Sequence, residues 1–281
     1  AAANPDLNAG FKAFDKLLVR HIGYAVSNFF RAFWMGLSAG KWVEGTPVNG
    51  PTTPYYRQLT RMSTALAFVA DISLLALGGE LKRKECLSAR LGDVLSQLYL
   101  ASAALKYYQD LHAQPDDLPY LEWVLQTCLF ECQQAFEGFF DNFPMSALAK
   151  ALRFVIMPYG RSYKAPSDRL NNRLAMHMME ASKLRDRLTH LCYVGTKPSD
   201  PLRRMEEAFT LALKVEPLRQ KCQAALKSRL LTKTTLLTDL YAQALTLNLL
   251  TEAEVALLTT ADAACQDAMH VDDFAPHAFV R

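Results

Sequence analysis

The sequence has little net charge and lacks the short motifs typical of nucleotide chemistry. Its 31 Lys and Arg residues are balanced by 28 Asp and Glu residues, which gives a formal net charge of +3. So mild a charge, spread along the chain, does not support nucleic acid as a partner. The sequence also contains neither G-x-G-x-x-G nor G-x-x-x-x-G-K-[ST], the glycine-rich patterns that hold nucleotide phosphates. No enzyme class is indicated by motif alone.

Thiol, export and membrane signals are equally sparse. The 281-residue chain has six Cys and no C-x-x-C pair, and it is too large to need disulfides, which predicts reduced thiols in a cytosolic compartment. The first ten residues lack the basic and then apolar layout of a secretory signal. No uninterrupted apolar run reaches the ~18–20 residues that span a bilayer. We therefore expect a cytoplasmic protein, with peripheral contact at the inner membrane as an open alternative.

What the sequence does contain is helical periodicity. Half of its residues are hydrophobic, and no region shows the strict alternation of a half-buried strand. We predict an all-α protein with a helical bundle over residues 1–156 and a smaller helical subdomain over residues 157–281. The loop at residues 157–168 marks the boundary between them.

The organising stretch is residues 59–108, where two long helical patterns flank a break at Gly78-Gly79. The first is apolar on most faces, including Leu74 and Leu75, so we expect this helix to be wrapped on most sides. The second alternates steps of four and three, which predicts a buried heptad seam. The predicted seam consists of Leu87, Leu91, Val94, Leu98, Ala101, Leu105 and Tyr108.

Shorter helical patterns occupy the rest of the chain. An aromatic-rich region at residues 11–33 predicts one or two helices, and Thr251 and Glu254 form a capping-box pattern. Glu216-Pro217 predicts the restart of a helix, and the tail at residues 270–281 is predicted to be extended or loose. Further helices are predicted at 119–140, 146–156, 168–179, 182–192, 202–215, 216–230 and 235–249.

Three candidate features each have an ordinary structural alternative. Cys128 and Cys132 have metal-ligand spacing, but they lie in an apolar stripe without a nearby His or acid, which favours buried thiols. The Gly78-Gly79 pair with its basic turn is more typical of a break between two helices than of a phosphate-binding loop. The aromatic cluster at residues 29–34 favours packing over a membrane anchor. We therefore predict neither a metal site nor a catalytic residue in this chain.

Within the loop at residues 157–168, the segment Pro158–Pro166 is the strongest binding candidate. Arg161 and Lys164 can meet an anion, and Tyr159 and Tyr163 can stack beside them. A structural loop pinned by its tyrosines explains the same residues equally well, so both interpretations stay open.

Several blocks of the sequence resemble the C-terminal region of the bacterial long-chain acyl-CoA dehydrogenase of fatty-acid β-oxidation. The similarity covers nearly the whole chain, and its longest block, Ser88–Ala103, is specific. A more distant similarity joins Leu81–Tyr108 to the extra helical region of mitochondrial very-long-chain acyl-CoA dehydrogenases. The other blocks are Ala13–Leu18 with His21–Gly23, Leu77–Glu85, Gly160–Asp168 and Val271–Phe274.

The resemblance implies an all-α fold and a FAD-dependent oxidation of long-chain acyl-CoA to trans-2-enoyl-CoA. The family's catalytic glutamate motif, of the Val-Glu-Gly-Ala-Asn type, is missing here. Glu44-Gly45-Thr46 is similar to a Glu-Gly-Thr variant, but it lies in a Pro- and Gly-rich loop downstream of the expected position, so no role is assigned to it. We expect the base and most of the flavin site to precede Ala1, which would make this chain the C-terminal part of such an enzyme.

The expected partners are the upstream catalytic part of the same enzyme and further copies of the chain in a homo-oligomer. The alternatives are an independent helical interaction module and a membrane-surface module that uses the aromatic cluster at residues 29–34.

Overall fold

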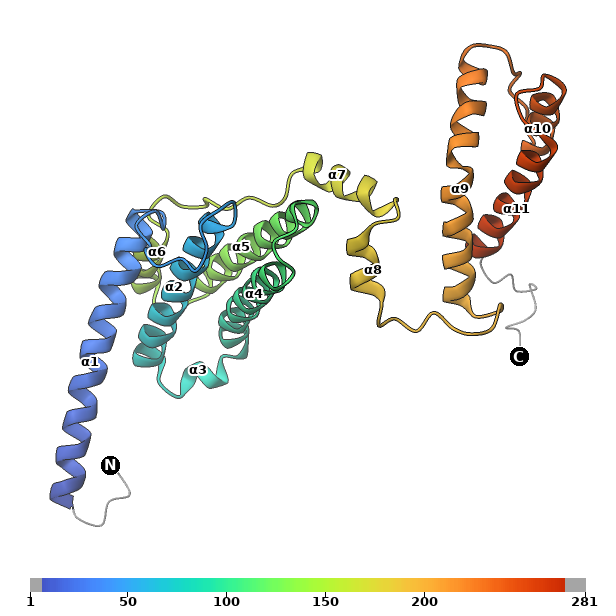
Figure 1. The fold of residues 1–281 in the computed structure, drawn as a ribbon. Helices are drawn as coiled ribbons and strands as arrows, with labels where there is room; N and C mark the ends of the chain where they lie inside the picture. The colour runs from blue at the N-terminus through green and yellow to red at the C-terminus, as the bar shows by residue number, and fades with distance from the viewer. Residues whose placement is uncertain (1–6, 271–281) are drawn as a thin grey trace, which may run out of the picture. The chain divides into compact units, whose positions relative to one another are not determined.

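The computed structural model describes residues 7–270, and within that range helices are the only regular elements (Figure 1). The predicted all-α class is confirmed. The chain divides into two compact units, Ala1–Ala175 and Met176–Arg281. The first unit includes the loop that follows residue 156, and the division into domains at residues 156 and 157 stays a prediction. Residues 271–281 of the predicted tail, with the block Val271–Phe274, lie outside the described residues.

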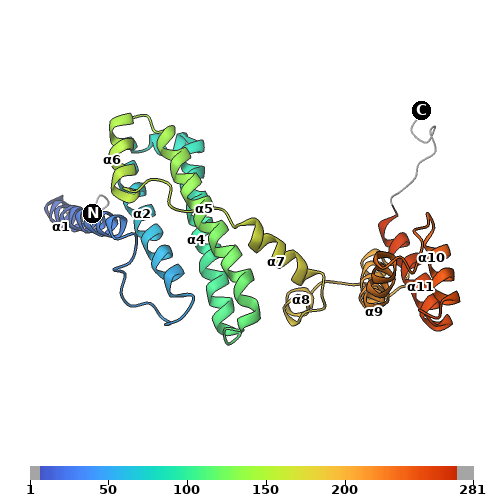
Figure 2. The same cartoon turned by 90° about the horizontal axis from the view of Figure 1, so that it is seen from above.

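An antiparallel helix pair forms the centre of the first unit. Helix α4 (Glu85–Asp110) and helix α5 (Leu118–Asp141) lie side by side, joined by the short 3₁₀ helix η1 (Pro115–Asp117) (Figure 2). The predicted seam of α4 is confirmed, since six of its seven members are buried and Leu91 is partly buried. The stripe on α5 faces this seam with side chains that include Leu125, Phe136 and Phe139. The heptad spacing therefore places one continuous apolar row between the two helices.

Helix α2 (Thr53–Leu77) adds a third side to this core and begins six residues before its predicted start. Pro54 suits its first turn, and Gly78 ends it with a φ of 54°, a left-handed conformation that favours glycine. The prediction that α2 is wrapped on most sides is wrong for its last turn, where Leu74 and Leu75 are 57% and 80% exposed. At about 100° per residue, both lie off the stripe that buries Met62 and Val69.

Within residues 7–270, one helix meets the length and composition criteria for a membrane span. Helix α2 is long and apolar enough to cross a membrane by length and composition. Core helices of soluble proteins pass the same test, and the buried stripe of α2 packs into the protein core. The hydropathy of α2 is therefore no independent evidence for a membrane span.

Helix α1 (Leu7–Leu37) is a single long helix whose C-terminal part is held against α2 and helix α6 (Ser146–Ile156). Gly36 permits the close approach to α6, because a Cβ at this position would lie 2.5 Å from the carbonyl oxygen of Val155. Ala32 and Asn28 are buried nearby. The N-terminal part of α1 projects away from the bundle (Figure 1). Between α2 and α4, the four-residue helix α3 (Glu80–Arg83) makes the turn.

Helix α7 (Asp168–Met178) follows the loop, and the second unit then contains four described helices. They are α8 (Lys183–Thr189), α9 (Pro201–Lys227), α10 (Leu237–Thr246) and α11 (Glu252–Met269). The core of this unit joins α9, α10 and α11, and the predicted capping box at Thr251 and Glu254 opens α11.

The predicted helix restart at Glu216-Pro217 is wrong, because α9 runs through Pro217 without a break. A proline inside a helix costs about 3 kcal/mol through its missing N–H and a clash with the preceding turn. Val215 and Cys222, on either side of Pro217, are both buried in the same core. We infer that burial on both sides of the proline offsets its local cost.

A leucine pair on α4 tests the seam. Leu105 is 1% exposed and Leu100 is 53% exposed on the same helix. We expect Leu105→Ala to lower the free energy of unfolding by about 2–5 kcal/mol, and Leu100→Ala to change it by less than about 0.5 kcal/mol. Urea unfolding followed by tryptophan fluorescence measures this unit selectively, because Trp34, Trp42 and Trp123 all lie in it. Equal losses for the two variants would contradict the assigned seam.

Candidate functional site

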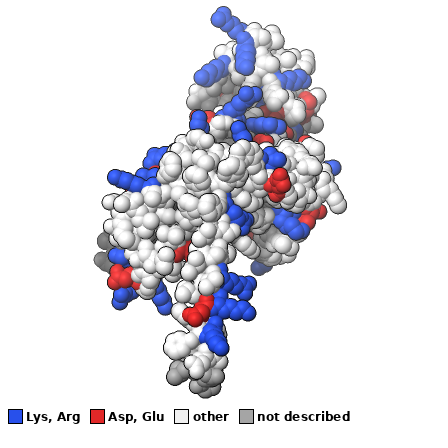
Figure 3. All heavy atoms as spheres, turned by 90° about the vertical axis from the view of Figure 1, so that its left-hand side faces the viewer, with Lys and Arg blue, Asp and Glu red and all other residues white. Residues whose placement is uncertain are grey.

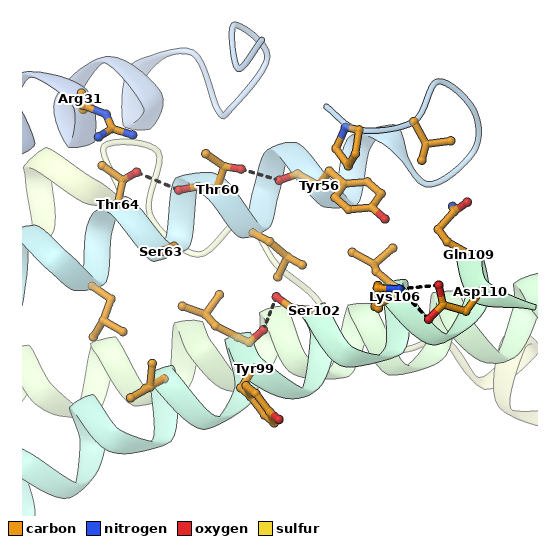
Figure 4. Close-up of a pocket in the computed structure, with 17 residues that line it drawn as sticks. Arg31, Tyr56, Thr60, Ser63, Thr64, Tyr99, Ser102, Lys106, Gln109 and Asp110 are labelled. Carbon is orange, nitrogen blue, oxygen red and sulfur yellow. Dashed lines mark hydrogen bonds and ion pairs between the residues drawn. The ribbon is translucent and has the colours of Figure 1, made fainter. Parts of the chain in front are cut away.

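Two cavities lie among the described residues of the first unit, and the one of larger volume is a groove between α2 and α4 (Figure 4). Its volume is about 790 Å³. The side chains along its floor are mainly apolar and include Leu59, Leu98 and Leu105. Arg31 of α1 lies near one end, and Lys106 and Asp110 of α4 lie near the other.

Several polar groups of this groove are engaged within their own helices. The hydroxyls of Thr60, Thr64 and Ser102 donate to backbone carbonyls four residues earlier, at 2.7–2.9 Å. The Lys106 ammonium pairs with both carboxylate oxygens of Asp110, at 2.5 and 2.7 Å. The groove thus provides a mainly apolar surface, and its Lys106–Asp110 ion pair is internal to α4, which suits packing by another apolar group.

The second cavity lies between α2, α5 and the loop that follows α6, and its volume is about 630 Å³. Gln133 of α5 holds the loop in place, because its side chain accepts from the Tyr163 N–H at 2.9 Å and donates to the Tyr163 carbonyl at 3.1 Å. The Tyr163 hydroxyl donates to Gln58 at 2.5 Å. The cavity is lined by Ala39, Pro54, Tyr55, Gln58, Arg61, Gln126, Leu129, Ser162, Tyr163, Lys164, Ala165 and Ser167.

The three predicted contact residues of the loop do not converge on one point. Arg161 lies outside the cavity lining and pairs with Glu137 at 3.6 Å, beside the ion pair of Arg153 with the same carboxylate. Tyr163 and Lys164 both line the cavity. Burial raises the pKa of Tyr163 to about 12, although the nearby guanidinium of Arg61 acts in the opposite direction. Ligand binding by these residues stays a prediction.

Sequence analysis missed the most unusual group of this cavity, the guanidinium of Arg61 on α2. Arg61 is only 4% exposed. It donates to the Tyr163 hydroxyl at 3.2 Å and to the Ile156 carbonyl at 3.1 Å, while its Nε atom is buried without a hydrogen-bond partner. The signal that could have revealed it is an arginine between Leu59 and Met62, on the buried stripe of an apolar helix.

The remaining candidates behave as structural features. Cys128 and Cys132 are 5% and 0% exposed in the core of α5. No group of three or more His, Cys, Asp or Glu side chains suited to a metal occurs within the described part of the chain. The Gly78-Gly79 break ends α2 and begins the exposed turn of α3, where Arg83 pairs with Glu80 at 3.1 Å. Glu44 is exposed in the irregular loop between α1 and α2.

The aromatic cluster at residues 29–34 is divided between packing and exposure. The Phe29 ring lies 5.7 Å from that of Phe68 on α2 and 6.1 Å from that of Phe33. Phe30 and Trp34 remain 62% and 56% exposed. The predicted packing therefore accounts for one side of the cluster and leaves the other uncovered.

Comparison with known proteins gives one family match. The family model "Acyl-CoA dehydrogenase, C-terminal, bacterial type" matches residues 1–274, which include both units almost completely. No solved structure matches the chain significantly.

This family implies a FAD-dependent dehydrogenase in general, so the described residues can be tested against a flavin. A flavin site directs hydrogen-bond donors at the ring nitrogens along a flat slot. In the α2–α4 groove the hydroxyls of Thr60, Thr64 and Ser102 are already bonded within their helices. In the second cavity Gln58 lies on α2, Gln126 on α5 and Lys164 on the loop, so its polar groups come from three elements and do not follow one flat slot. Neither donor set fits the flavin ring, and we derive no step through it.

Two neighbouring glutamines on α5 test how the loop is held. Gln133 is 1% exposed and makes both bonds to Tyr163, whereas Gln134 is exposed. We expect Gln133→Ala to speed tryptic cleavage after Arg161 and Lys164 by roughly 30-fold, because two bonds of about 1 kcal/mol each are lost. The Gln134→Ala variant should be cleaved at the same rate as the unsubstituted chain. Mass spectrometry of the early fragments measures cleavage in both variants. Equal cleavage of the two would contradict the role of the two Gln133–Tyr163 hydrogen bonds, here called the Gln133–Tyr163 clamp.

Thiol reactivity tests the burial of the α5 cysteines. Burial raises the pKa of Cys132 to about 12 and also raises the pKa of Cys128, so neither forms a reactive thiolate near neutral pH. We expect the exposed Cys86 and Cys192 to react first with an aromatic disulfide reagent, and Cys132 to react only on unfolding. The raised pKa of Cys132 also makes the stability of the fold depend on pH. The neutral thiol favours the folded state below about pH 9, and this contribution is lost as pH rises towards 12.

The double variant Cys86→Ser/Cys192→Ser should remove the fast phase of this reaction. A fast phase that persists in the double variant and maps to Cys132 by peptide mass would contradict the assigned burial.

Proposed function

Because the chain belongs to the bacterial-type acyl-CoA dehydrogenase C-terminal family, we propose that it is the C-terminal helical part of a long-chain acyl-CoA dehydrogenase of fatty-acid β-oxidation. Such an enzyme is FAD-dependent and oxidises long-chain acyl-CoA to trans-2-enoyl-CoA. In this proposal the catalytic base and the flavin site belong to another part of the enzyme. The present chain covers that part and stabilises the assembly.

The observation that carries this role is the uncovered apolar surface of α1. Eleven large apolar side chains of this one helix are exposed by 37% or more. Figure 3 shows this face as mainly uncharged, with Lys and Arg and fewer Asp and Glu side chains along it. The exposed residues are Phe11, Phe14, Leu17, Leu18, Val19, Ile22, Tyr24, Val26, Phe29, Phe30 and Trp34.

An apolar surface of this extent on one helix is typical of a protein–protein or membrane contact. Helix α1 exposes large apolar side chains around most of its circumference in its N-terminal part, whereas a helix apolar nearly all round is normally enclosed by protein. The remainder of the dehydrogenase, or a second copy of the chain in a homo-oligomer, would supply that enclosure. This supports an accessory helical region that works in an assembly.

A second candidate function is binding at a membrane surface. It is favoured by the basic residues Lys12, Lys16, Arg20 and Arg31, which accompany the exposed aromatic side chains of α1. A cytoplasmic location with peripheral contact at the inner membrane fits this arrangement and remains part of the proposal.

Co-expression with the flavin-containing part of the dehydrogenase tests the first candidate. We expect a stable complex that reduces an electron acceptor with palmitoyl-CoA, while the 281-residue chain alone binds no flavin and has no activity. Phe14→Ser/Leu18→Ser removes two side chains one turn apart on α1, 54% and 44% exposed, and should weaken association by about tenfold or more.

The matched control Leu75→Ser/Leu100→Ser changes two exposed leucines on α2 and α4 and should leave association unchanged. The proposal would be contradicted if the chain alone bound flavin and oxidised palmitoyl-CoA. It would also be contradicted if the flavin-containing part were stable and active without binding this chain. Co-sedimentation of the chain with anionic vesicles, lost in the α1 variant only, would favour the membrane candidate instead.

A further inference from the structure

The cavity beside Arg61 carries an unbalanced positive charge. Arg61 and Lys164 both line it, and none of the described residues in its lining is an Asp or Glu. No carboxylate within residues 7–270 lies at ion-pair distance from either cation. By contrast, Arg153 and Arg161 near the same loop are both paired with Glu137. The cavity therefore differs electrostatically from its surroundings.

A buried cation without a counter-ion is costly unless an anion joins it. The hydrogen bonds of Arg61 go to neutral acceptors, the Tyr163 hydroxyl, Gln58 and the Ile156 carbonyl. They satisfy its Nη donors without neutralising the charge, and Nε remains buried without a partner. An anion in the cavity would provide the missing charge.

The other groups in the lining suit a phosphate. Lys164 is exposed on a flexible stem, so its ammonium can move onto a bound ligand. Ser162 and Ser167 add hydroxyl donors from the same loop, and Tyr55 adds another from α2. A phosphate has enough acceptor oxygens to use two cations and several hydroxyls together, whereas a carboxylate has two. The volume of about 630 Å³ is within the range for small-molecule pockets and leaves room for more than the anion itself.

We propose that this cavity binds a phosphate group, either as the free anion or as a phosphate ester, held by the fixed charge of Arg61 and the mobile ammonium of Lys164. The loop is kept over the cavity by the Gln133–Tyr163 clamp, so the site is built before the ligand arrives. This inference does not depend on the proposed dehydrogenase role, because it concerns the chain by itself.

The test is calorimetric titration of the 281-residue chain with inorganic phosphate at constant ionic strength, together with melting curves. We expect saturable binding and a melting temperature that rises with phosphate, but not with added chloride. Coenzyme A and adenosine serve as second probes, since the first carries phosphates and the second does not. Tighter binding of coenzyme A than of phosphate would identify a phosphate ester as the ligand, and the reverse order would identify the free anion. Both orders support the proposal.

Two cations three residues apart on the same loop give a matched pair of variants. Lys164→Gln should weaken phosphate binding by about tenfold, as expected when a charge-assisted contact is lost. Arg161→Gln makes the same change of charge outside the cavity lining and should weaken binding by less than about twofold. Arg61→Gln should abolish binding, and because this change alters a buried network, its fold is checked by circular dichroism. If that variant does not fold, the Lys164 and Arg161 pair still decides the question.

Three results would overturn the proposal. The first is a chain that shows no saturable phosphate binding. The second is binding that Lys164→Gln and Arg161→Gln weaken equally, which would indicate general attraction to a basic loop. The third is acetate binding as tightly as phosphate and with the same dependence on Lys164, which would identify a carboxylate site.

Discussion

The burial of one heptad seam of α4 against α5 is the constraint from which the rest of the first unit follows. Val94, Ala101 and Leu105 are 0–1% exposed and belong to one core with Leu125, Cys132 and Phe136 of α5. Two antiparallel helices leave their joint flank open, and α2 covers it with its own narrow stripe. The loop after α6 can then reach α2 and α5 at once, which places Tyr163 between Gln58 and Gln133.

Buried polar side chains of the first unit meet at that loop. Gln133 and Arg61 are both nearly inaccessible, and each uses its buried position to hold the loop. Buried polar groups are costly unless bonded, so such a cluster specifies one arrangement of the loop over many. The same cluster leaves the charge of Arg61 uncompensated beside a cavity, which joins a structural role to a proposed binding role.

Prediction from sequence succeeded where a pattern depended on one helix. The seam of α4, the bounds of α6 and the capping box of α11 each follow from spacing or from a local hydrogen bond, and the structure has them as predicted. It was wrong where a neighbouring element decided the outcome. Leu74 and Leu75 are exposed because they lie off the stripe of α2, and Pro217 stays inside α9 because the core holds both of its sides. Of the three loop residues, Tyr163 and Lys164 line the cavity and Arg161 pairs with Glu137.

By itself, the sequence determined the helical class, most helix positions and the family resemblance, because helical period and local blocks are properties of neighbouring residues. Only the tertiary structure decided which apolar faces are covered, and it shows α1 with a long uncovered surface. It alone brought Arg61, Gln58 and Gln133 to the loop, across separations of about a hundred residues for the first two. The physical reason is that burial and charge compensation depend on partners distant in the chain, and spacing along one helix does not specify them.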